Sequence, residues 1–312
     1  MYIGIDLGGT NIAAGVVDDS GKIIKQLSVP TLATRPAEEI IKDMAAVSKE
    51  VVAQAGLDMK NIKSIGIGSP GSVDNANGEI VYANNLPFSH TKMREELQKH
   101  IDLPVNLEND ANAAAYGEYI AMGHGVDSFI AITLGTGVGG GIILNQKIYR
   151  GFNGAGAELG HFTLVHNGEP CTCGKPGCWE AYASVTALIN QTRAAMEKHP
   201  DSIMHKMAQE EGKVSGRTAF TSAKNGDSAA QAVVDQYIAY VADGITSIIN
   251  IFQPDMLVIG GGISKEGDYL LKPLVEITEK FNYNKELPKT DIRIATLFND
   301  AGIIGAALAA RQ

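Results

Sequence analysis

The stretch Ile5-Asp6-Leu7-Gly8-Gly9-Thr10, followed by Ala14-Gly15-Val16-Val17, has a counterpart 127 residues further along the chain. The counterpart reads Ile132-Thr133-Leu134-Gly135-Thr136-Gly137 and is followed by Gly141-Ile142-Ile143-Leu144. Each copy combines an apolar strand, a glycine turn that contains a threonine, and a returning strand. Two hairpins can resemble each other by chance, but a repeat at the spacing of one domain predicts a duplicated α/β unit.

The segments around the two copies alternate between strand and helix patterns, which is typical of an α/β fold. We expect a small N-terminal domain at 1–118, completed by a C-terminal helix at 301–312, and a large domain at 119–300. The predicted strands lie at 2–7, 13–17, 22–29, 64–68, 104–107, 129–134, 142–144, 256–259 and 291–297. The predicted helices lie at 35–54, 93–100, 111–122, 181–198, 301–310, and between Asp227 and Pro254.

Size and charge limit the possible classes of protein. With 312 residues and 33.0 kDa the chain is long enough for two domains. A net charge of −9 and a pI near 5.3 disfavour broad nucleic-acid binding. The sequence shows no signal-peptide pattern and no apolar run that could span a bilayer, and its closely spaced cysteines suit a reducing compartment. We therefore expect a cytoplasmic protein with neither a membrane nor a nucleic acid as partner.

All three cysteines lie within eight residues, in Cys171-Thr172-Cys173-Gly174-Lys175-Pro176-Gly177-Cys178. With His161 upstream they form a three-thiolate, one-imidazole set, which is the composition of a closed structural zinc site. The glycines and the proline provide tight turns that let the thiols converge. Two alternatives remain open: the cysteines can be buried or free thiols, and His166 can replace His161 as the fourth ligand.

Two acids, Glu158 and Glu180, bracket this turn. A metal-bound turn holds its backbone rigidly, so both carboxylates would be fixed beside it. Carboxylates on a rigid support can bind a polyhydroxylated ligand, which is a hypothesis at this point.

Three glycine-rich corners follow predicted strands. Glycine lets a backbone approach phosphate oxygens, so the three corners together predict a nucleotide site, although any one of them can be a plain turn. The sequence lacks the GxxxxGK[ST] pattern. Asp6 lies at the first corner and is expected to serve Mg²⁺ beside the phosphates, unless it only bonds to the turn. The residues expected at the nucleotide are Asp6, Gly8, Gly9, Thr10, Gly135, Thr136, Gly137, Gly261 and Gly262.

Asp110 follows Glu108 and Asn109 at a predicted strand-to-helix junction. Asp often caps helices, so a purely structural role is one reading. Ligands of α/β sheets, however, bind at strand ends. A carboxylate there can accept the proton of a substrate hydroxyl as the hydroxyl attacks a γ-phosphate.

These segments, Asp6-Leu7-Gly8-Gly9-Thr10, Glu108-Asn109-Asp110-Ala111-Asn112 and Glu158-Leu159-Gly160-His161 with the cysteine turn, closely resemble the ROK family of repressors, open reading frames and kinases. The resemblance covers essentially the whole chain. It implies a two-domain actin/hexokinase-like fold, a duplicated ribonuclease-H-like α/β unit in which sugar and ATP meet in a cleft between the domains.

The resemblance also implies roles for individual residues. Asp110 resembles the general base of the family. His161 would use one ring nitrogen for zinc and turn the other toward the sugar, so that zinc holds the sugar pocket in shape. The residues implied at the sugar are Gly71, Asn85, Asn109, Asp110, Glu158, His161 and Glu180, and those implied at zinc are His161, Cys171, Cys173 and Cys178.

Within the family, repressors carry a helix-turn-helix before the DxGGT segment, and with Asp6 so near the start we expect none here. The retained Asp110 favours an ATP-dependent hexose kinase, and the resemblance points most to a glucokinase acting on the 6-hydroxyl of glucose. Kinases for N-acetylmannosamine, N-acetylglucosamine or fructose, and a non-catalytic sugar sensor, are the alternatives. The donor can be ATP or also polyphosphate, and a homodimer or homotetramer is expected.

Overall fold

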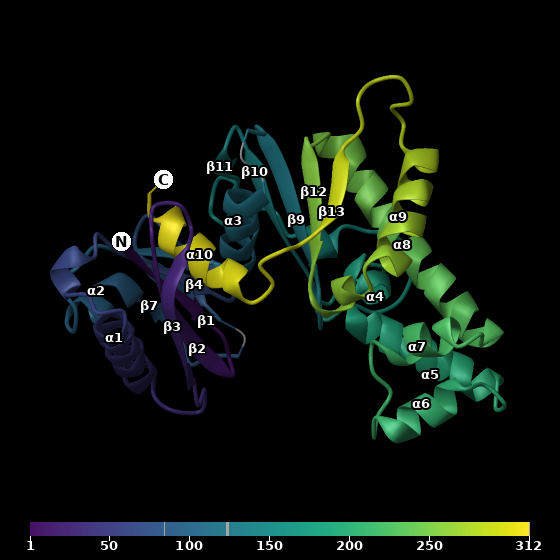
Figure 1. Cartoon of the computed structure of the whole chain (residues 1–312), viewed down its shortest axis with the longest axis horizontal. Helices are drawn as coiled ribbons and strands as arrows, with labels where there is room; N and C mark the ends of the chain where they lie inside the picture. The colour runs from purple at the N-terminus through teal and green to yellow at the C-terminus, as the bar shows by residue number, and fades with distance from the viewer. Residues whose placement is uncertain (84, 123–124, 312) are drawn as a thin grey trace. The chain divides into compact units, whose positions relative to one another are not determined.

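The computed structural model describes residues 1–83, 85–122 and 125–311 (Figure 1). The chain forms two compact units: the first comprises Met1–Ala131, Gly140–Ala157 and Thr296–Gln312, and the second comprises Ile132–Gly139 and Glu158–Ala295. The domain boundary expected after residue 118 falls inside helix α3 (Asp110–Met122), so the first unit extends further along the chain than the sequence suggested.

The sequence repeat corresponds to a repeated sheet topology. One sheet has the order β3-β2-β1-β4-β8, and the other has the order β11-β10-β9-β12-β13. In each sheet the first strand of the hairpin is therefore central, with its two following strands on one side and two later strands on the other. The bounds are β1 Tyr2–Leu7, β2 Asn11–Val17, β3 Ile23–Pro30, β4 Ile65–Ser69, β8 Val105–Asn109, β9 Ser128–Leu134, β10 Val138–Leu144, β11 Lys147–Ile148, β12 Met256–Gly260 and β13 Asp291–Ile294.

The strand directions in the first sheet show where the carboxyl ends of its parallel strands lie. β1 pairs antiparallel with β2 and parallel with β4, and β4 pairs parallel with β8. The carboxyl ends of β1, β4 and β8 therefore lie at one edge of the sheet. Asp6 lies near the end of β1, and Asp110 directly follows β8.

Helix α1 (Ala37–Gln54) contributes an apolar face to the core of the first unit, in which Ile40, Met44 and Val51 are fully buried. Burial of each such side chain contributes about 1.5–3 kcal/mol. The helix begins two residues later than expected because Pro36, at its N-cap, has an extended backbone (ψ 145°).

A small three-stranded sheet between β4 and α2 (Met93–Gln98) was not predicted from the sequence. Its strands are β5 (Ser72–Asp74), β6 (Glu79–Tyr82) and β7 (Ser89–Thr91), in the order β5-β6-β7. β5 and β7 are three residues long and mainly polar, and β6 has only four residues, so no period-2 apolar pattern marks them.

Helix α10 (Asp300–Ala309) lies against β1, β4 and α3 of the first unit (Figure 1). Glycines make this approach possible, because a Cβ at Gly4 would lie 1.9 Å from the carbonyl oxygen of Ile303 and one at Gly66 would lie 1.8 Å from that of Ala306. The helix is formed almost entirely by small and aliphatic residues, which is why it can pack so closely.

Gly66→Ala is expected to lower the free energy of unfolding by about 3 kcal/mol, because the new methyl group would collide with the α10 backbone. Denaturant titration measures this loss. Gly56→Ala is the control: a Cβ at this position would have nothing within 4 Å, and only its left-handed backbone (φ 71°) opposes the change, at about 1 kcal/mol. Equal midpoints for the two variants would contradict the packing argument.

The helices of the second unit are α4 Glu180–Ala183, α5 Val185–Lys198, α6 Met204–Glu210, α7 Thr218–Lys224, α8 Ser228–Phe252 and α9 Asp268–Phe281. The single helix expected at 181–198 is interrupted at Ser184, which has an extended backbone (ψ 161°) and whose side chain accepts a hydrogen bond from the amide of Ala187. Ser184 thus starts α5 as its N-cap. Asp227 caps α8 in the same way, as predicted.

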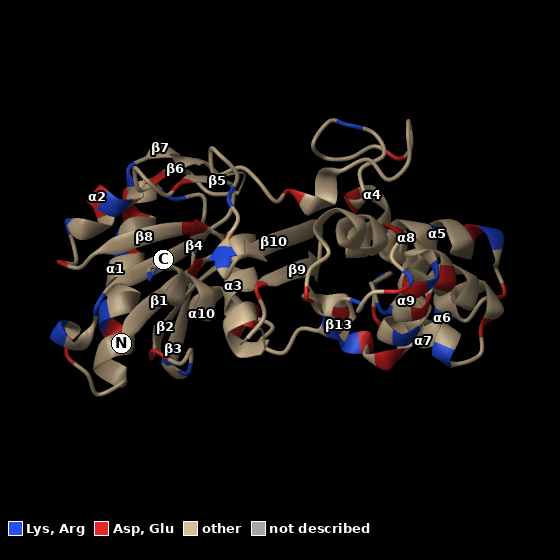
Figure 2. Ribbon diagram, turned by 90° about the horizontal axis from the view of Figure 1, so that it is seen from above, with Lys and Arg blue, Asp and Glu red and all other residues tan. Residues whose placement is uncertain are grey.

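Acidic and basic residues are interspersed on the helices of the second unit (Figure 2). One example is the pair on α9 in which Lys272 Nζ lies 2.9 Å from Asp268 Oδ2. Such exposed pairs contribute little to stability, because water screens their charges. Among the described residues, no helix combines the length and apolarity needed to cross a membrane.

Candidate functional site

The Asp110 junction is built by the side chain that precedes it. Asn109 Oδ1 accepts hydrogen bonds from the amides of Ala111 (3.0 Å) and Asn112 (3.1 Å), so Asn109 caps the first turn of α3. Its Nδ2 also donates to the carbonyl oxygen of Gly71 (3.2 Å). Asp110 Oδ1 accepts from the amide of Ala111 (2.8 Å). The capping role that the sequence left open for Asp110 is thus filled largely by Asn109.

Asp6 and Asp110 are both half-buried at the edge of the first sheet. Burial raises the pKa of Asp110 above its ordinary value. Burial, and then the nearby charge of Asp110, raise the pKa of Asp6 to about 6. Two carboxylates that disfavour each other's charge are a setting in which a cation is favourable.

A cavity of about 660 Å³ in the first unit lies against the first glycine corner. Asp6, Gly8, Gly9 and Thr10 line it together with residues at the start of α10, including Asp300. The structure therefore brings four of the residues predicted at the nucleotide into one hollow of the first unit.

Asp6→Asn is expected to stabilise the protein near neutral pH. Folding raises the pKa of Asp6 from 3.8 to about 6, so the folded state favours the neutral acid over the carboxylate. Asp6 therefore supports the fold fully below about pH 3.8, and this support is lost as the pH rises through about 6. The charged form therefore destabilises the fold at neutral pH by about 3 kcal/mol, and the substitution removes this charge.

The measurement is the free energy of unfolding of wild type and variant at about pH 7.5 and about pH 4, where the gain should vanish. Asp18→Asn is the control of opposite sign, because a hydrogen bond from the Ser20 side chain holds the pKa of Asp18 below its usual range. A pH-independent gain for Asp6→Asn would contradict the argument.

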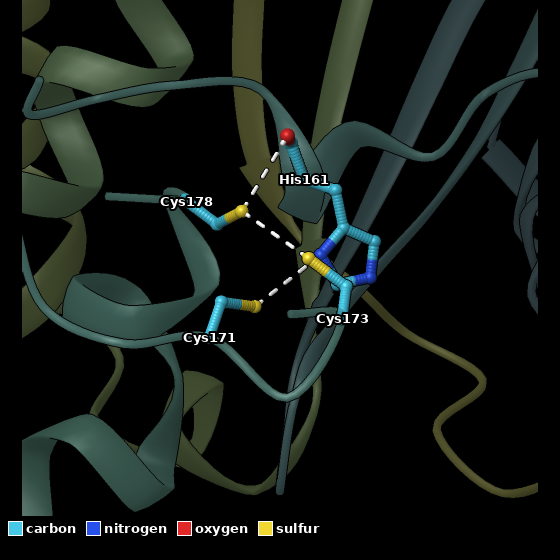
Figure 3. A group of neighbouring side chains, drawn as sticks. All are labelled: His161, Cys171, Cys173 and Cys178. Carbon is cyan, nitrogen blue, oxygen red and sulfur yellow. Dashed lines mark hydrogen bonds between the residues drawn. The ribbon is translucent and has the colours of Figure 1, made fainter. Parts of the chain in front are cut away.

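The predicted cysteine–histidine set comes together in the second unit (Figure 3). The ligand atoms of His161, Cys171, Cys173 and Cys178 lie within 4.8 Å of one another. Nδ1 of His161 lies 3.6 Å from Cys171 Sγ, and the other ring nitrogen faces away from the sulfur atoms (Figure 3). Among the described residues, the cluster does not include His166, the alternative ligand.

The geometry and chemistry of this cluster fit a tetrahedral metal ion. Cys173 Sγ and Cys178 Sγ are 3.6 Å apart, and a tetrahedron with metal–sulfur bonds of about 2.3 Å has edges of about 3.8 Å. Burial, reinforced by the neighbouring thiols, raises the pKa of Cys178 to about 12, so this thiol becomes a thiolate only with a compensating cation. Hydrogen bonding to the backbone at Lys175 lowers the pKa of Cys173. The cluster could therefore hold a metal ion, and the reading of three unrelated buried thiols is disfavoured.

Glu180 joins this turn to the second glycine corner. Its Oε2 accepts from the amide of Val138 (2.9 Å), and its Oε1 accepts from Thr172 Oγ1 (3.2 Å) and from Cys171 Sγ (3.6 Å). A Cβ at Gly137 would lie 2.3 Å from Glu180 Oε2. This connection was missed in the sequence, because no pattern links positions 42 residues apart.

The predicted glycines divide into two kinds. Gly261 has φ 90°, and a Cβ there would lie 2.1 Å from the carbonyl oxygen of Leu134, so its role in the fold is close backbone packing. Gly71 is similar, with φ 89°, and a Cβ there would lie 2.0 Å from the carbonyl oxygen of Tyr82. Gly135 and Gly262 face open space, since a Cβ at either position would have nothing within 4 Å. Gly135 and Gly262 therefore leave room for a ligand beside their α-carbons.

The predicted sugar residues belong to both units. Gly71, Asn85, Asn109 and Asp110 lie in the first, where a Cβ at Gly9 would lie 3.4 Å from Asn85 Cβ. Glu158, His161 and Glu180 lie in the second, with Glu158 at the N-cap of the short 3₁₀ helix Leu159–His161 and the other two in contact with Cys171.

Comparison with known proteins identifies relatives over the whole chain. The ROK family model matches residues 2–312. Glucokinase of Thermotoga maritima is 38% identical over 307 residues, covering 98% of this chain and 95% of that protein. The putative xylose repressor of a Caldicellulosiruptor species is 30% identical, covering 98% of this chain and 76% of that protein.

A solved structure of similar fold is the ROK family glucokinase of Streptomyces griseus in complex with glucose and AMPPNP. It is 35% identical, the alignment covers 100% of this chain and 99% of that one, and the TM-score is 0.82. Together with the repeated sheet order, this similarity confirms the actin/hexokinase-like α/β fold class.

Proposed function

This chain belongs to the ROK family, and we propose that it is an ATP-dependent hexose kinase that phosphorylates the 6-hydroxyl of glucose. The observation that carries the proposal is the half-buried Asp110 carboxylate at the carboxyl end of a parallel strand, with a raised pKa and Asp6 beside it. Full-length relatives named glucokinase support the choice of substrate.

Asp110 is the proposed general base. Its carboxylate accepts the proton of the 6-hydroxyl as that oxygen attacks the γ-phosphorus of ATP, and the β–γ bridging oxygen leaves with ADP. A raised pKa makes Asp110 a stronger base than an ordinary aspartate. No covalent intermediate with the protein is needed, because positioning and electrostatics provide most of the catalysis of phosphoryl transfer.

We propose that the sugar hydroxyls are bound by the residues that the family resemblance implies. Asn109 supports the junction through its bonds to α3 and to Gly71, and it offers its amide to the sugar. His161 presents the ring nitrogen that faces away from the sulfur atoms. The full proposed set is Gly71, Asn85, Asn109, Asp110, Glu158, His161 and Glu180.

The phosphates of ATP are proposed to bind at the glycine corners through backbone amides. Asp6 would hold Mg²⁺, which supplies positive charge to the phosphate oxygens when bound. The other proposed nucleotide residues are Gly8, Gly9, Thr10, Gly135, Thr136, Gly137, Gly261 and Gly262. Gly261 is packed against the backbone of Leu134, so we propose that it contributes through its backbone groups.

For the cysteine cluster we propose zinc, held by His161, Cys171, Cys173 and Cys178. Three thiolates and one imidazole are the ligand set that zinc prefers in structural sites. Closely spaced thiols stay reduced in the cytoplasm, which is the compartment that we propose. A homodimer or homotetramer remains our expectation, and light scattering measures it.

The test is ADP release, measured by a coupled assay, with a panel of glucose, fructose, mannose, N-acetylglucosamine and N-acetylmannosamine. Fastest turnover with glucose supports the proposal, and fastest turnover with an amino sugar would reassign the substrate. A protein that binds glucose in calorimetry but releases no ADP with any sugar would be a sensor, and the kinase proposal would be wrong. Polyphosphate in place of ATP tests the donor.

A further inference from the structure

Glu108 is a buried carboxylate that the proposed mechanism does not use. Its residue is 3% exposed, and it lies two positions before Asp110, near the end of β8. A buried charge is unfavourable unless other groups compensate it, so its partners indicate what it does.

One oxygen of this carboxylate binds a cation. Glu108 Oε2 lies 2.7 Å from Arg150 Nε and 2.6 Å from Arg150 Nη2, and Asn75 Nδ2 donates to it at 3.3 Å. Arg150 begins the glycine-rich part of the segment that leads to Glu158. Glu108 therefore fastens that segment to the strand that ends just before Asp110.

The other oxygen binds the start of α3. Glu108 Oε1 accepts from the amide of Asn109 (3.0 Å) and from Asn112 Nδ2 (3.1 Å). These two groups flank Asp110 on either side in the chain. The carboxylate consequently fixes the backbone before Asp110 and the helix turn after it.

Stability alone does not explain this arrangement. A buried ion pair is often no more stabilising than apolar residues of the same volume, because both charges lose their hydration. Arg150 keeps 28% of its side chain exposed, whereas Glu108 keeps 4%, so it is the acid whose desolvation costs most. Five donors converge on this one acid beside the proposed base.

We infer that Glu108, neutralised by Arg150, is a positioning residue that holds Asp110 and Asn109 in the geometry for proton transfer. The inference rests on the proposed kinase function of the same site. Glu108 itself acts through Asn109, Asn112 and Arg150, and it touches no reacting atom in this account.

The main test is Glu108→Gln. A glutamine amide presents its own N–H groups to Arg150 or to the donors of α3, so it cannot satisfy both sides as a carboxylate does. We expect kcat to fall about 10- to 100-fold, because small displacements of a catalytic group have effects of this size, while KM for ATP changes less than about threefold. An unchanged kcat in an active enzyme would overturn the inference.

Glu118→Gln is the matched control. Glu118 is 4% exposed and lies on α3, the helix that begins at Asp110, and its carboxylate accepts from the amides of Thr296 (3.0 Å) and Leu297 (2.8 Å). We expect this variant to melt at a lower temperature and to keep kcat within about twofold of wild type. Equal losses of kcat in Glu118→Gln and Glu108→Gln would mean general destabilisation and would also overturn the inference.

Two further measurements separate positioning from structure. If Glu108 and Arg150 act together as an ion pair, the double variant Glu108→Gln/Arg150→Gln should lose no more kcat than the worse single variant. A loss equal to the product of the two single losses would contradict the inference. Hydrogen exchange needs no turnover: Glu108→Gln should speed exchange in the peptide that carries the Asn109 amide, and Glu118→Gln should not. Wild-type turnover with the hexose panel judges the kinase proposal separately, since it does not depend on either variant.

Discussion

Asp110→Asn is expected to lower kcat for hexose phosphorylation by about 100- to 10,000-fold, the usual contribution of a general base. The variant keeps the size of the side chain and the oxygen that accepts from the Ala111 amide, so the junction should remain folded. Glucose affinity, measured by calorimetry without ATP, should change little. Turnover within a few-fold of wild type would remove the role assigned to Asp110.

The control for this variant is Asp227→Asn. Asp227 also lies at the start of a helix, where it accepts from the Ala230 amide and caps α8. It should lose stability at most, with kcat unchanged. A comparable loss of kcat in Asp227→Asn would show that the Asp110 effect is a capping effect.

The pH dependence of kcat/KM in the wild-type enzyme tests the same role of Asp110. Burial raises the pKa of Asp110, and only its deprotonated form accepts a proton. The kcat/KM should therefore fall on the acid side at a pH above the ordinary value of 3.8. An acid limb at or below 3.8 would contradict a buried base.

The second large effect is expected from Cys173→Ser, which should remove bound zinc and weaken glucose binding about 10- to 100-fold. Cys173 Sγ lies 3.6 Å from Cys178 Sγ, and its loss leaves three ligands for the ion. Without the ion, the turn that carries Glu180 and His161 loses its rigid support. Metal analysis of the purified protein and calorimetry with glucose measure both consequences.

Chelation of the wild-type protein is the matching experiment, because it removes the ion without a substitution. It should reproduce the loss of glucose affinity and lower the melting temperature, and added zinc should restore both. A zinc-free protein that binds glucose with unchanged affinity would break the proposed coupling between the metal turn and the sugar pocket.

Some site features could be predicted from the sequence because they depend on neighbours in the chain. Three cysteines in eight residues can meet only if a tight turn joins them, and Asp110 follows an apolar strand directly. The choice between His161 and His166 could not be made this way, because both lie upstream at suitable distances. That Asn109 is the main cap of α3, and not Asp110, could be seen only from the direction of each side chain.

The structural elements that the sequence did not predict also have physical explanations. The strands β5–β7 have only three or four residues each, so they form through pairing with one another and show no local pattern. Helix α9 was not predicted, although its sequence is amphipathic. The break at Ser184 was not predicted because serine also occurs inside helices, so a serine N-cap within a helical pattern does not stand out. The first unit differs from the expected range because it combines segments that are far apart in the chain and close in space.

The sequence by itself determined the repeated hairpin, the α/β class, the cysteine turn and the acid at the start of α3, because each depends on the order of residues within about one structural element. Only the tertiary structure decided the rest: the Glu180 bridge to Val138, the Arg150–Glu108 pair and the packing of α10 on Gly4 and Gly66. These contacts join residues between 42 and 299 positions apart. Local sequence carries no record of such pairs, since folding of the whole chain brings them together.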